Sequence, residues 1–193
     1  MHFTKKLLFL FIFFGCFTIY AQESKGKEVL NIFTFEEVEE LHQQTPKPIL
    51  IFLYTDWCKI CFGMKKTTFK DQEVIKLLNN NFYFIKLNAE EKQDITFLGR
   101  TFMYKPSGNS GTHELAKELA FINGKISYPT TTILNINLEI DLQVSDYISR
   151  KNMSVILRKL MFHIPDMASP LAKKRIQIKS IHNTSNCLNV RGH

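Results

Sequence analysis

The fold is decided by one short stretch of sequence, Thr55-Asp56-Trp57-Cys58-Lys59-Ile60-Cys61, in which two cysteines are separated by two residues. The apolar run Ile49–Tyr54 stands directly before it and has the length and the β-branched and aromatic content of a buried strand. The residues from Cys61 to Lys66 contain no proline and can continue as a helix. The sequence therefore predicts a strand, a short turn, Cys58 at the start of a helix, and Cys61 about one turn further on.

A cysteine at the start of a helix is reactive, because unpaired backbone N–H groups and the positive end of the helix dipole stabilise a thiolate. This placement predicts a lowered pKa for Cys58, whereas Cys61 should be more buried and more thiol-like. Asp56, Lys59 and Ile60 can modulate the pair, but exposed charges of this kind contribute about 1 kcal/mol or less. The expected chemistry is thiol–disulfide exchange, in which Cys58 attacks a substrate disulfide and Cys61 resolves the mixed disulfide.

Three other roles are open to cysteines at this spacing, and each fits the sequence less well. A structural zinc site needs four ligands, and beyond the leader the chain offers only Cys187, in a polar tail. Covalent haem attachment needs a histidine after the second cysteine, where this chain has Phe62. A purely structural disulfide would close a very small loop and stabilise little. We therefore expect redox chemistry at the pair, with no metal and no cofactor.

The composition bounds the size and the partners of the protein. A chain of 193 residues with 45% hydrophobic and 22% charged residues is sufficient for one ordinary globular domain. The formal net charge is +7, but Lys5 and Lys6 lie in the leader and most of the remaining excess falls after residue 163. The middle of the chain is nearly neutral, so the composition gives no reason to expect a nucleic acid as partner.

Residues 1–21 have the pattern of a secretory signal peptide, with two lysines, the apolar run Leu7–Phe14 and a small residue, Ala21, at the expected cleavage point. The apolar run is shorter than a membrane span requires. An alternative is lipid attachment at Cys16, which would tether the protein to a membrane, but apolar residues rather than a polar tether follow it. Export predicts a periplasmic or extracellular location, where disulfides persist.

The mature chain begins with alternating strands and helices. Residues 28–33 predict a short first strand, and Thr34 with Glu37 has the spacing of a capping box at the start of a helix. Proline residues end that helix before the strand that leads to Cys58. A helix over 72–78, ended by three asparagines, precedes a strand over 82–87, and this connection predicts parallel pairing of the two strands.

The second half of the chain is less regular. Lys92–Gly111 is rich in glycine and polar residues and predicts a long loop, with an extra strand or turn over 95–104. Thr112 should cap the next helix, and a β-branched strand should follow Tyr128-Pro129 and pair with residues 138–144 in a hairpin. A last helix over 149–162 completes a domain over 28–163. The remaining residues, 164–193, predict a basic, disordered tail.

The chain resembles the thioredoxin superfamily, in particular bacterial exported thioredoxin-like proteins with one C-x-x-C. The matching residues are Trp57–Cys61 after a strand, Lys86-Leu87-Asn88 at the end of the next strand, and Tyr128-Pro129-Thr130 before the hairpin. The resemblance implies an α/β fold with a central mixed sheet flanked by helices and an insertion before the cis-proline strand. It also implies that Pro129 is cis and faces the cysteines, so that Tyr128 presents a backbone edge to a substrate peptide and Trp57 contacts substrate.

The chain departs from the superfamily pattern at several positions. Phe52 stands where thioredoxins carry a buried acidic residue, so the proton acceptor for Cys61 is either missing or supplied elsewhere, with water, Glu90 and Glu91 as candidates. Lys59-Ile60 replaces the usual Gly-Pro between the cysteines, and the Lys92–Gly111 insertion is absent from minimal members. Because the intervening residues tune thiolate stability, the direction of electron flow stays open.

Several other side chains have two interpretations. His113 is either a general base near the thiols or, as we favour, a solvated first-turn residue. Trp57 either shields the cysteines and contacts substrate or packs in the core. We interpret Tyr54 and Phe62 as packing residues, and Cys187 as a tail cysteine without a redox role.

The sequence thus favours an exported thiol–disulfide oxidoreductase that reduces or exchanges disulfides in envelope proteins. Its partners would be disulfide-containing client proteins and a membrane or envelope redox partner that recharges the pair. Two alternatives without turnover are a thioredoxin-fold binding or adaptor module and an assembly factor for metal or haem enzymes.

Overall fold

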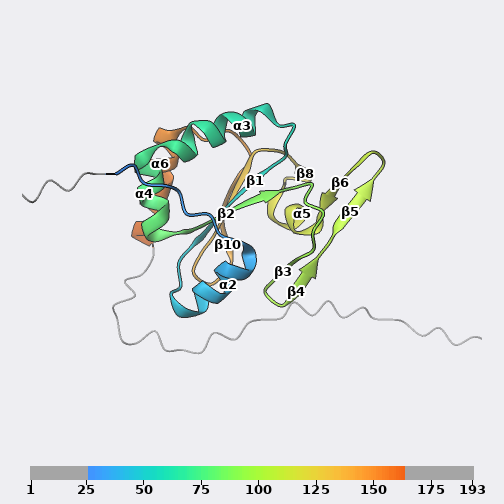
Figure 1. The fold of residues 1–193 in the computed structure, drawn as a ribbon, viewed down its shortest axis with the longest axis horizontal. Helices are drawn as coiled ribbons and strands as arrows, with labels where there is room; N and C mark the ends of the chain where they lie inside the picture. Colours follow the sequence, from blue (N-terminus) through green and yellow to red (C-terminus); the bar gives the residue numbers. More distant parts are fainter. Residues whose placement is uncertain (1–25, 164–193) are drawn as a thin grey trace, which may run out of the picture.

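The computed structural model describes residues 26–163 (Figure 1). The predicted signal peptide, Cys16, the basic tail and Cys187 lie outside the described residues. None of the helices between residues 26 and 163 combines the length and the apolar character needed to cross a bilayer.

A four-stranded mixed sheet in the order β10-β9-β1-β2 forms the centre of the described structure. β1 (Ile49–Tyr54) runs parallel to β2 (Tyr83–Asn88), with Ile49 opposite Tyr83. β9 (Thr130–Leu134) pairs with β1 in the antiparallel sense, and β10 (Ile140–Val144) completes the hairpin. The predicted α/β fold, the parallel pairing and the C-terminal hairpin are therefore confirmed.

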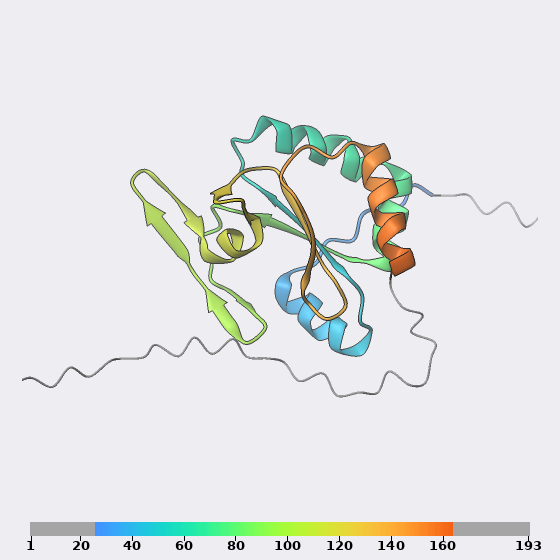
Figure 2. The same ribbon diagram turned by 180° about the vertical axis from the view of Figure 1, so that it is seen from behind.

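Helices cover both faces of this sheet (Figures 1 and 2). On one face, α2 (Phe35–Gln44) and α5 (Glu114–Ala120) pack against Ile49, Ile51 and Leu53. On the other face, Leu50 and Phe52 contact the layer that contains the cysteines. The elements of that layer are α3 (Lys59–Lys66), the 3-10 helix η2 (Thr68–Lys70), α4 (Gln72–Asn81) and α6 (Arg150–His163). The alternation along β1 thus divides the core into two clusters, one on each face of the sheet.

The predicted capping box starts α2. The Thr34 side chain accepts a hydrogen bond from the Glu37 backbone N–H, and the Glu37 carboxylate accepts one from the Thr34 N–H. Both bonds satisfy backbone donors that the helix itself leaves unpaired. The helix ends at Gln44, before Pro46, as the sequence predicts.

The segment Lys92–Gly111 folds into two β-hairpins, so the predicted long loop is wrong, whereas the extra strand or turn predicted over 95–104 is confirmed. β3 (Ile95–Phe97) pairs with β4 (Arg100–Phe102), and β5 (Tyr104–Ser107) pairs with β6 (Ser110–His113). A third hairpin, β7 (Phe121–Ile122) with β8 (Lys125–Ile126), turns at Asn123-Gly124. The first two hairpins project from the side of the sheet opposite to α4 and α6 (Figure 2).

Three further boundaries differ from the sequence predictions. Residues 28–33 do not form a strand, since only Phe33 makes a bridge, to Ile85 of β2. α4 continues through the asparagines to residue 81, because the Asn81 side chain donates to the Leu77 carbonyl within the helix. α5 is capped by His113 rather than Thr112, which belongs to β6.

Candidate functional site

Cys58 and Cys61 form a disulfide at the N-terminus of α3, with their Cα atoms 5.2 Å apart. Cys58 is the N-cap residue, and its Sγ accepts a hydrogen bond of 3.1 Å from the Cys61 backbone N–H. The Cys58 N–H in turn donates to the Thr55 carbonyl, which closes the turn between β1 and the helix. The predicted order of strand, turn, Cys58 and helix is confirmed. The N–H that caps the helix is therefore available to stabilise negative charge on the first sulfur.

The two cysteines differ in burial as predicted. Cys58 is 7% exposed, whereas Cys61 is fully buried. Both belong to the apolar cluster that also contains Phe52 and Met64. Lys59 and Ile60, on the first turn of α3, are exposed beside them. Cys58 is therefore the more exposed of the two, and Cys61 lies in an apolar environment.

The peptide bond between Tyr128 and Pro129 is cis, as the resemblance to thioredoxins implies. Pro129 is buried directly before β9, and Tyr128 packs against the cluster that contains the cysteines. The rings of Trp57 and Tyr128 meet edge to face, with centroids 6.4 Å apart. The fold thus brings Tyr128 next to Trp57, which directly precedes Cys58, although about seventy positions separate the two aromatic residues in the sequence.

Trp57 is 68% exposed, so the interpretation of this residue as core packing is wrong. Its indole N–H donates to the Glu90 carboxylate at 3.1 Å. Burial, followed by the charge of Glu90, raises the pKa of Tyr128 to about 12. Glu90 therefore fixes the tryptophan and lies close enough to Tyr128 to act on its phenol.

A second pair of polar residues fixes the turn. The Asn88 side chain donates to the Asp56 carboxylate at 3.0 Å and also accepts from the Glu90 N–H. Sequence reasoning noticed Asn88 and Glu90 individually but did not connect them to Asp56 and Trp57. The available signal was that Asn88 ends β2 and Glu90 follows it, because the carboxyl end of β2 lies beside that of β1 in a parallel pair.

The buried residues of the described chain, 26–163, include neither aspartate nor glutamate. Phe52, the position at which the sequence departs from the thioredoxin pattern, is fully buried in β1. Of the two glutamates considered as substitutes, Glu90 binds Trp57, and Glu91 accepts from the N–H groups of Lys92 and Gln93. These contacts leave the Cys61 side of the pair without a buried carboxylate.

His113 does not have the solvated position that we favoured. It is fully buried, its Nδ1 accepts from the Leu115 N–H, and its Nε2 bonds to the Gln93 carbonyl. Both ring nitrogens are engaged, one at the start of α5 and the other with the chain before β3, which is a structural role. Phe62 was interpreted as a packing residue, but it is 57% exposed. Tyr54 is half-buried and stacks on Phe52.

Within residues 26–163, the His, Cys, Asp and Glu side chains form no group able to hold a metal ion.

Comparisons with known proteins agree with this geometry. Residues 27–113 match the family described as "Thioredox_DsbH: Protein of unknown function, DUF255". The "Thiol:disulfide interchange protein DsbD" of Colwellia psychrerythraea is 30% identical over 114 residues, which are 48% of this chain and 19% of that protein. The chain spans between 10% and 19% of the length of the first curated relatives that it matches.

Solved structures show the same fold. The structure "DsbH Oxidoreductase" matches with a TM-score of 0.52 and 14% identity, covering 74% of this chain and 92% of that one. A thioredoxin from Thermus thermophilus matches with a TM-score of 0.50 and 17% identity, covering 69% and 88%. Together with the sheet order and the position of the bridged pair, these likenesses show that the chain has a thioredoxin-like fold.

Proposed function

We propose that this protein is a thiol–disulfide oxidoreductase that reduces or exchanges disulfides in client proteins. The observation that carries the proposal is the Cys58–Cys61 disulfide at the N-terminus of α3, with the first sulfur near the surface and the second buried. The name of the Colwellia relative, a thiol:disulfide interchange protein, supports the same chemistry.

The reaction follows from the positions of the two sulfurs. In the reduced protein, the Cys58 thiolate attacks one sulfur of a substrate disulfide, and the other substrate sulfur leaves as a thiolate. Cys61 then loses its proton and attacks the Cys58 sulfur of the mixed disulfide, so the second substrate sulfur is released. Two electrons pass to the substrate, and the protein returns to the bridged state of the structure. An external dithiol must reduce the pair before the next turnover.

The backbone N–H of Cys61 is central to the first step. It already donates to Cys58 Sγ in the bridged state, and in the reduced state it would hold the thiolate. Trp57, which precedes Cys58 and meets the Tyr128 ring edge to face, is proposed to contact the substrate chain together with Tyr128 and the cis Pro129. Asp56, Lys59 and Ile60 would adjust the stability of the thiolate from the exposed turn. Export to the periplasm or the extracellular space, and recharging by a membrane or envelope partner, complete the proposal.

Insulin reduction by dithiothreitol tests the activity. The wild-type chain should accelerate the reaction, and Cys58→Ser should lower the rate to that of dithiothreitol alone. Cys61→Ser should instead accumulate a mixed disulfide, which non-reducing electrophoresis resolves. Cys187→Ser is the matched control, because it removes a thiol outside the pair, and it should keep the wild-type rate. Equal rates for the wild type and Cys58→Ser would refute turnover and favour the adaptor function.

The pKa of Cys58 provides an independent test. Alkylation of the reduced Cys61→Ser variant by iodoacetamide across a pH series should give a pKa below about 8.5, the ordinary value for a free thiol. A pKa at or above that value would remove the electrostatic basis of the mechanism.

A further inference from the structure

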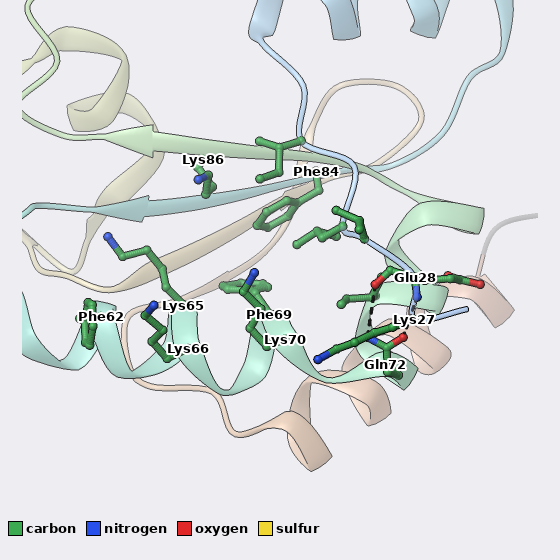
Figure 3. A pocket seen from close by; sticks show the side chains of 14 residues that line it. Lys27, Glu28, Phe62, Lys65, Lys66, Phe69, Lys70, Gln72, Phe84 and Lys86 are labelled. Carbon is green, nitrogen blue, oxygen red and sulfur yellow. Dashed lines mark hydrogen bonds between the residues drawn. The ribbon is translucent and has the colours of Figure 1, made fainter. Parts of the chain in front are cut away.

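A groove of about 510 Å³ runs beside α3, between the helical layer and the segment before α2 (Figure 3). Its walls are the helical layer from Phe62 to Ile75 and the extended segment Lys27–Ile32, and β2 contributes Phe84 and Lys86. It begins next to the redox pair, since Phe62 follows Cys61 directly. The proposed redox chemistry makes no use of it.

The groove has an apolar floor and apolar points along its rim. Phe69, Ile75 and Phe84 form the floor and are almost fully buried. Val29 and Phe62 are large side chains on the rim, and they are 79% and 57% exposed. Apolar residues of this size with so much exposed surface are typical of a surface that another molecule covers.

The charge around the groove is strongly one-sided. Its lining contains a single carboxylate, that of Glu28, against five ammonium groups, although the middle of the chain is nearly neutral. The Lys66 ammonium lies 5.4 Å above the ring of Phe62, so cationic and apolar groups alternate at this end. The five lysines are Lys27, Lys65, Lys66, Lys70 and Lys86. A complementary ligand must be anionic and must carry apolar groups between its charges.

The outer wall of the groove is fixed by hydrogen bonds. The Gln72 side chain accepts from the Glu28 N–H at 2.8 Å and donates to the Glu28 carbonyl (Figure 3). The Asn79 side chain likewise accepts from the Asn31 N–H and donates to the Val29 carbonyl. The segment is therefore anchored to α4 at two places, which holds the groove open without a ligand.

We propose that this groove docks an acidic segment of a protein partner, with apolar side chains between its carboxylates. The open groove and its exposed lysine side chains fit an extended chain better than a small enclosed ligand. The protein's own C-terminal tail is a poor occupant, because after residue 163 five basic residues stand against Asp166 alone. The inference rests on the proposed function in one respect, since docking here would hold a client or redox partner beside Cys58.

Fluorescence anisotropy with the full chain tests the groove. The probe is a short fluorescein-labelled peptide in which glutamates alternate with leucine and phenylalanine, and the counter-probe has lysine in place of each glutamate. The double variant Lys70→Glu with Lys86→Glu reverses two exposed charges in the groove. The control, Lys117→Glu with Lys125→Glu, makes the same charge change at exposed positions of α5 and β8.

The wild-type chain and the control should bind the acidic probe equally, and the groove variant should bind about tenfold more weakly at low salt. The lysine probe should not bind. Equal affinities for both double variants, or equal affinities for the two probes, would overturn the proposal. Dodecanoate binding that depends on Lys70 and Lys86, without peptide binding, would assign the groove to a lipid. Self-association lost only in the groove variant would assign it to a second copy of the chain.

The binding measurement needs no turnover, so it can fail or succeed independently of the proposed activity. Reduction of the small neutral substrate 2-hydroxyethyl disulfide should be the same in the wild type and both double variants. Absence of that reduction in the wild type would refute the oxidoreductase proposal and leave the groove untouched.

Discussion

The central sheet, whose strand β1 leads to Cys58, and the hairpin region between Ile95 and Ile126 are built in different ways. In the sheet, every residue from Ile49 to Leu53 is fully buried, and helices pack on both faces. In the hairpin region, strands of two to four residues pair only with their immediate neighbours in sequence. Burial of apolar surface stabilises the sheet, whereas local hydrogen bonds and backbone conformations specify the turns of the hairpins.

The hairpin region depends on individual residues in special environments. Leu98 and Gly99 form the turn of the first hairpin with positive φ angles, and the Leu98 N–H donates to the Glu39 carboxylate on α2. At Gly111, an added Cβ would collide with the ring of Tyr104 across the second hairpin. The comparison shows that the sheet depends on a general pattern of apolar residues, whereas the hairpin turns depend on individual residues such as Gly99 and Gly111.

The largest expected effect is on the sheet. Phe52→Ala removes a fully buried ring that contacts Tyr54 and Phe69, and it should lower the free energy of unfolding by about 3 to 5 kcal/mol. Phe121→Ala is the control in the hairpin region, where the ring is 57% exposed, and should cost less than about 1 kcal/mol. Urea denaturation measures both. Similar losses in the two variants would erase the contrast between the regions.

The next effect concerns His113, the residue that caps α5. His113→Ala removes the cap of α5 and leaves the Gln93 carbonyl without its partner, so it should cost about 2 kcal/mol. His113→Asn can restore the cap and should recover part of the loss, as judged by thermal unfolding. Full wild-type stability of the alanine variant would show that burial alone holds the hairpins in place.

A smaller effect of opposite sign is expected within the sheet. The hydroxyl of Thr131, in register with Phe52, is buried and has no hydrogen-bond partner among the described residues. Thr131→Val should therefore raise the free energy of unfolding by about 1 kcal/mol. Thr132→Val is the matched control, because that hydroxyl donates to the Leu119 carbonyl, and it should destabilise. Stabilisation by both substitutions, or by neither, would contradict the assignment.

The smallest effect is on the titration of Tyr128. Burial and Glu90 raise its pKa to about 12 in the folded protein, so the unfolded chain ionises first, near pH 10. Stability contributed by the neutral phenol is present below pH 10 and is lost as the pH rises towards 12. Absorbance at 295 nm, compared with Tyr128→Phe, isolates the transition. Glu90→Gln should lower the pKa but keep it above 10, because burial is the larger cause; an unchanged pKa would exclude an effect of Glu90.

The predictable parts of the structure are those encoded by continuous or periodic apolar residues. The run before Cys58 gave the bounds of β1 without error, and Thr34 with Glu37 located the start of α2. The position of Cys58 as N-cap followed from the same pattern, because a buried strand must end before a helix can begin. The cis state of Pro129 came from the resemblance to thioredoxins and not from the residues alone.

The parts that could not be predicted depend on contacts between distant residues. The side chains of Gln72 and Asn79, 44 to 50 positions further along the chain, hydrogen-bond to the backbone of residues 28–31. The segment therefore has the sequence pattern of a strand but does not pair as one with a neighbouring strand. His113 is polar, which predicts an exposed position, but its bond to the Gln93 carbonyl satisfies the ring when it is buried. That contact joins residues twenty positions apart and cannot be seen in the sequence. The Glu90 bond to Trp57 likewise requires knowing that β1 and β2 end side by side.

The single bridge from Phe33 to Ile85 has a consequence for the solubility of the protein. β2 is an outermost strand of the sheet, and exposed strand edges are templates for aggregation. The Phe33 N–H donates a hydrogen bond to the Phe84 carbonyl, and the segment before Phe33 lies along the same side of β2. Proteolysis that removed this segment would uncover the edge of β2 and leave it open to pairing with a second copy of the chain.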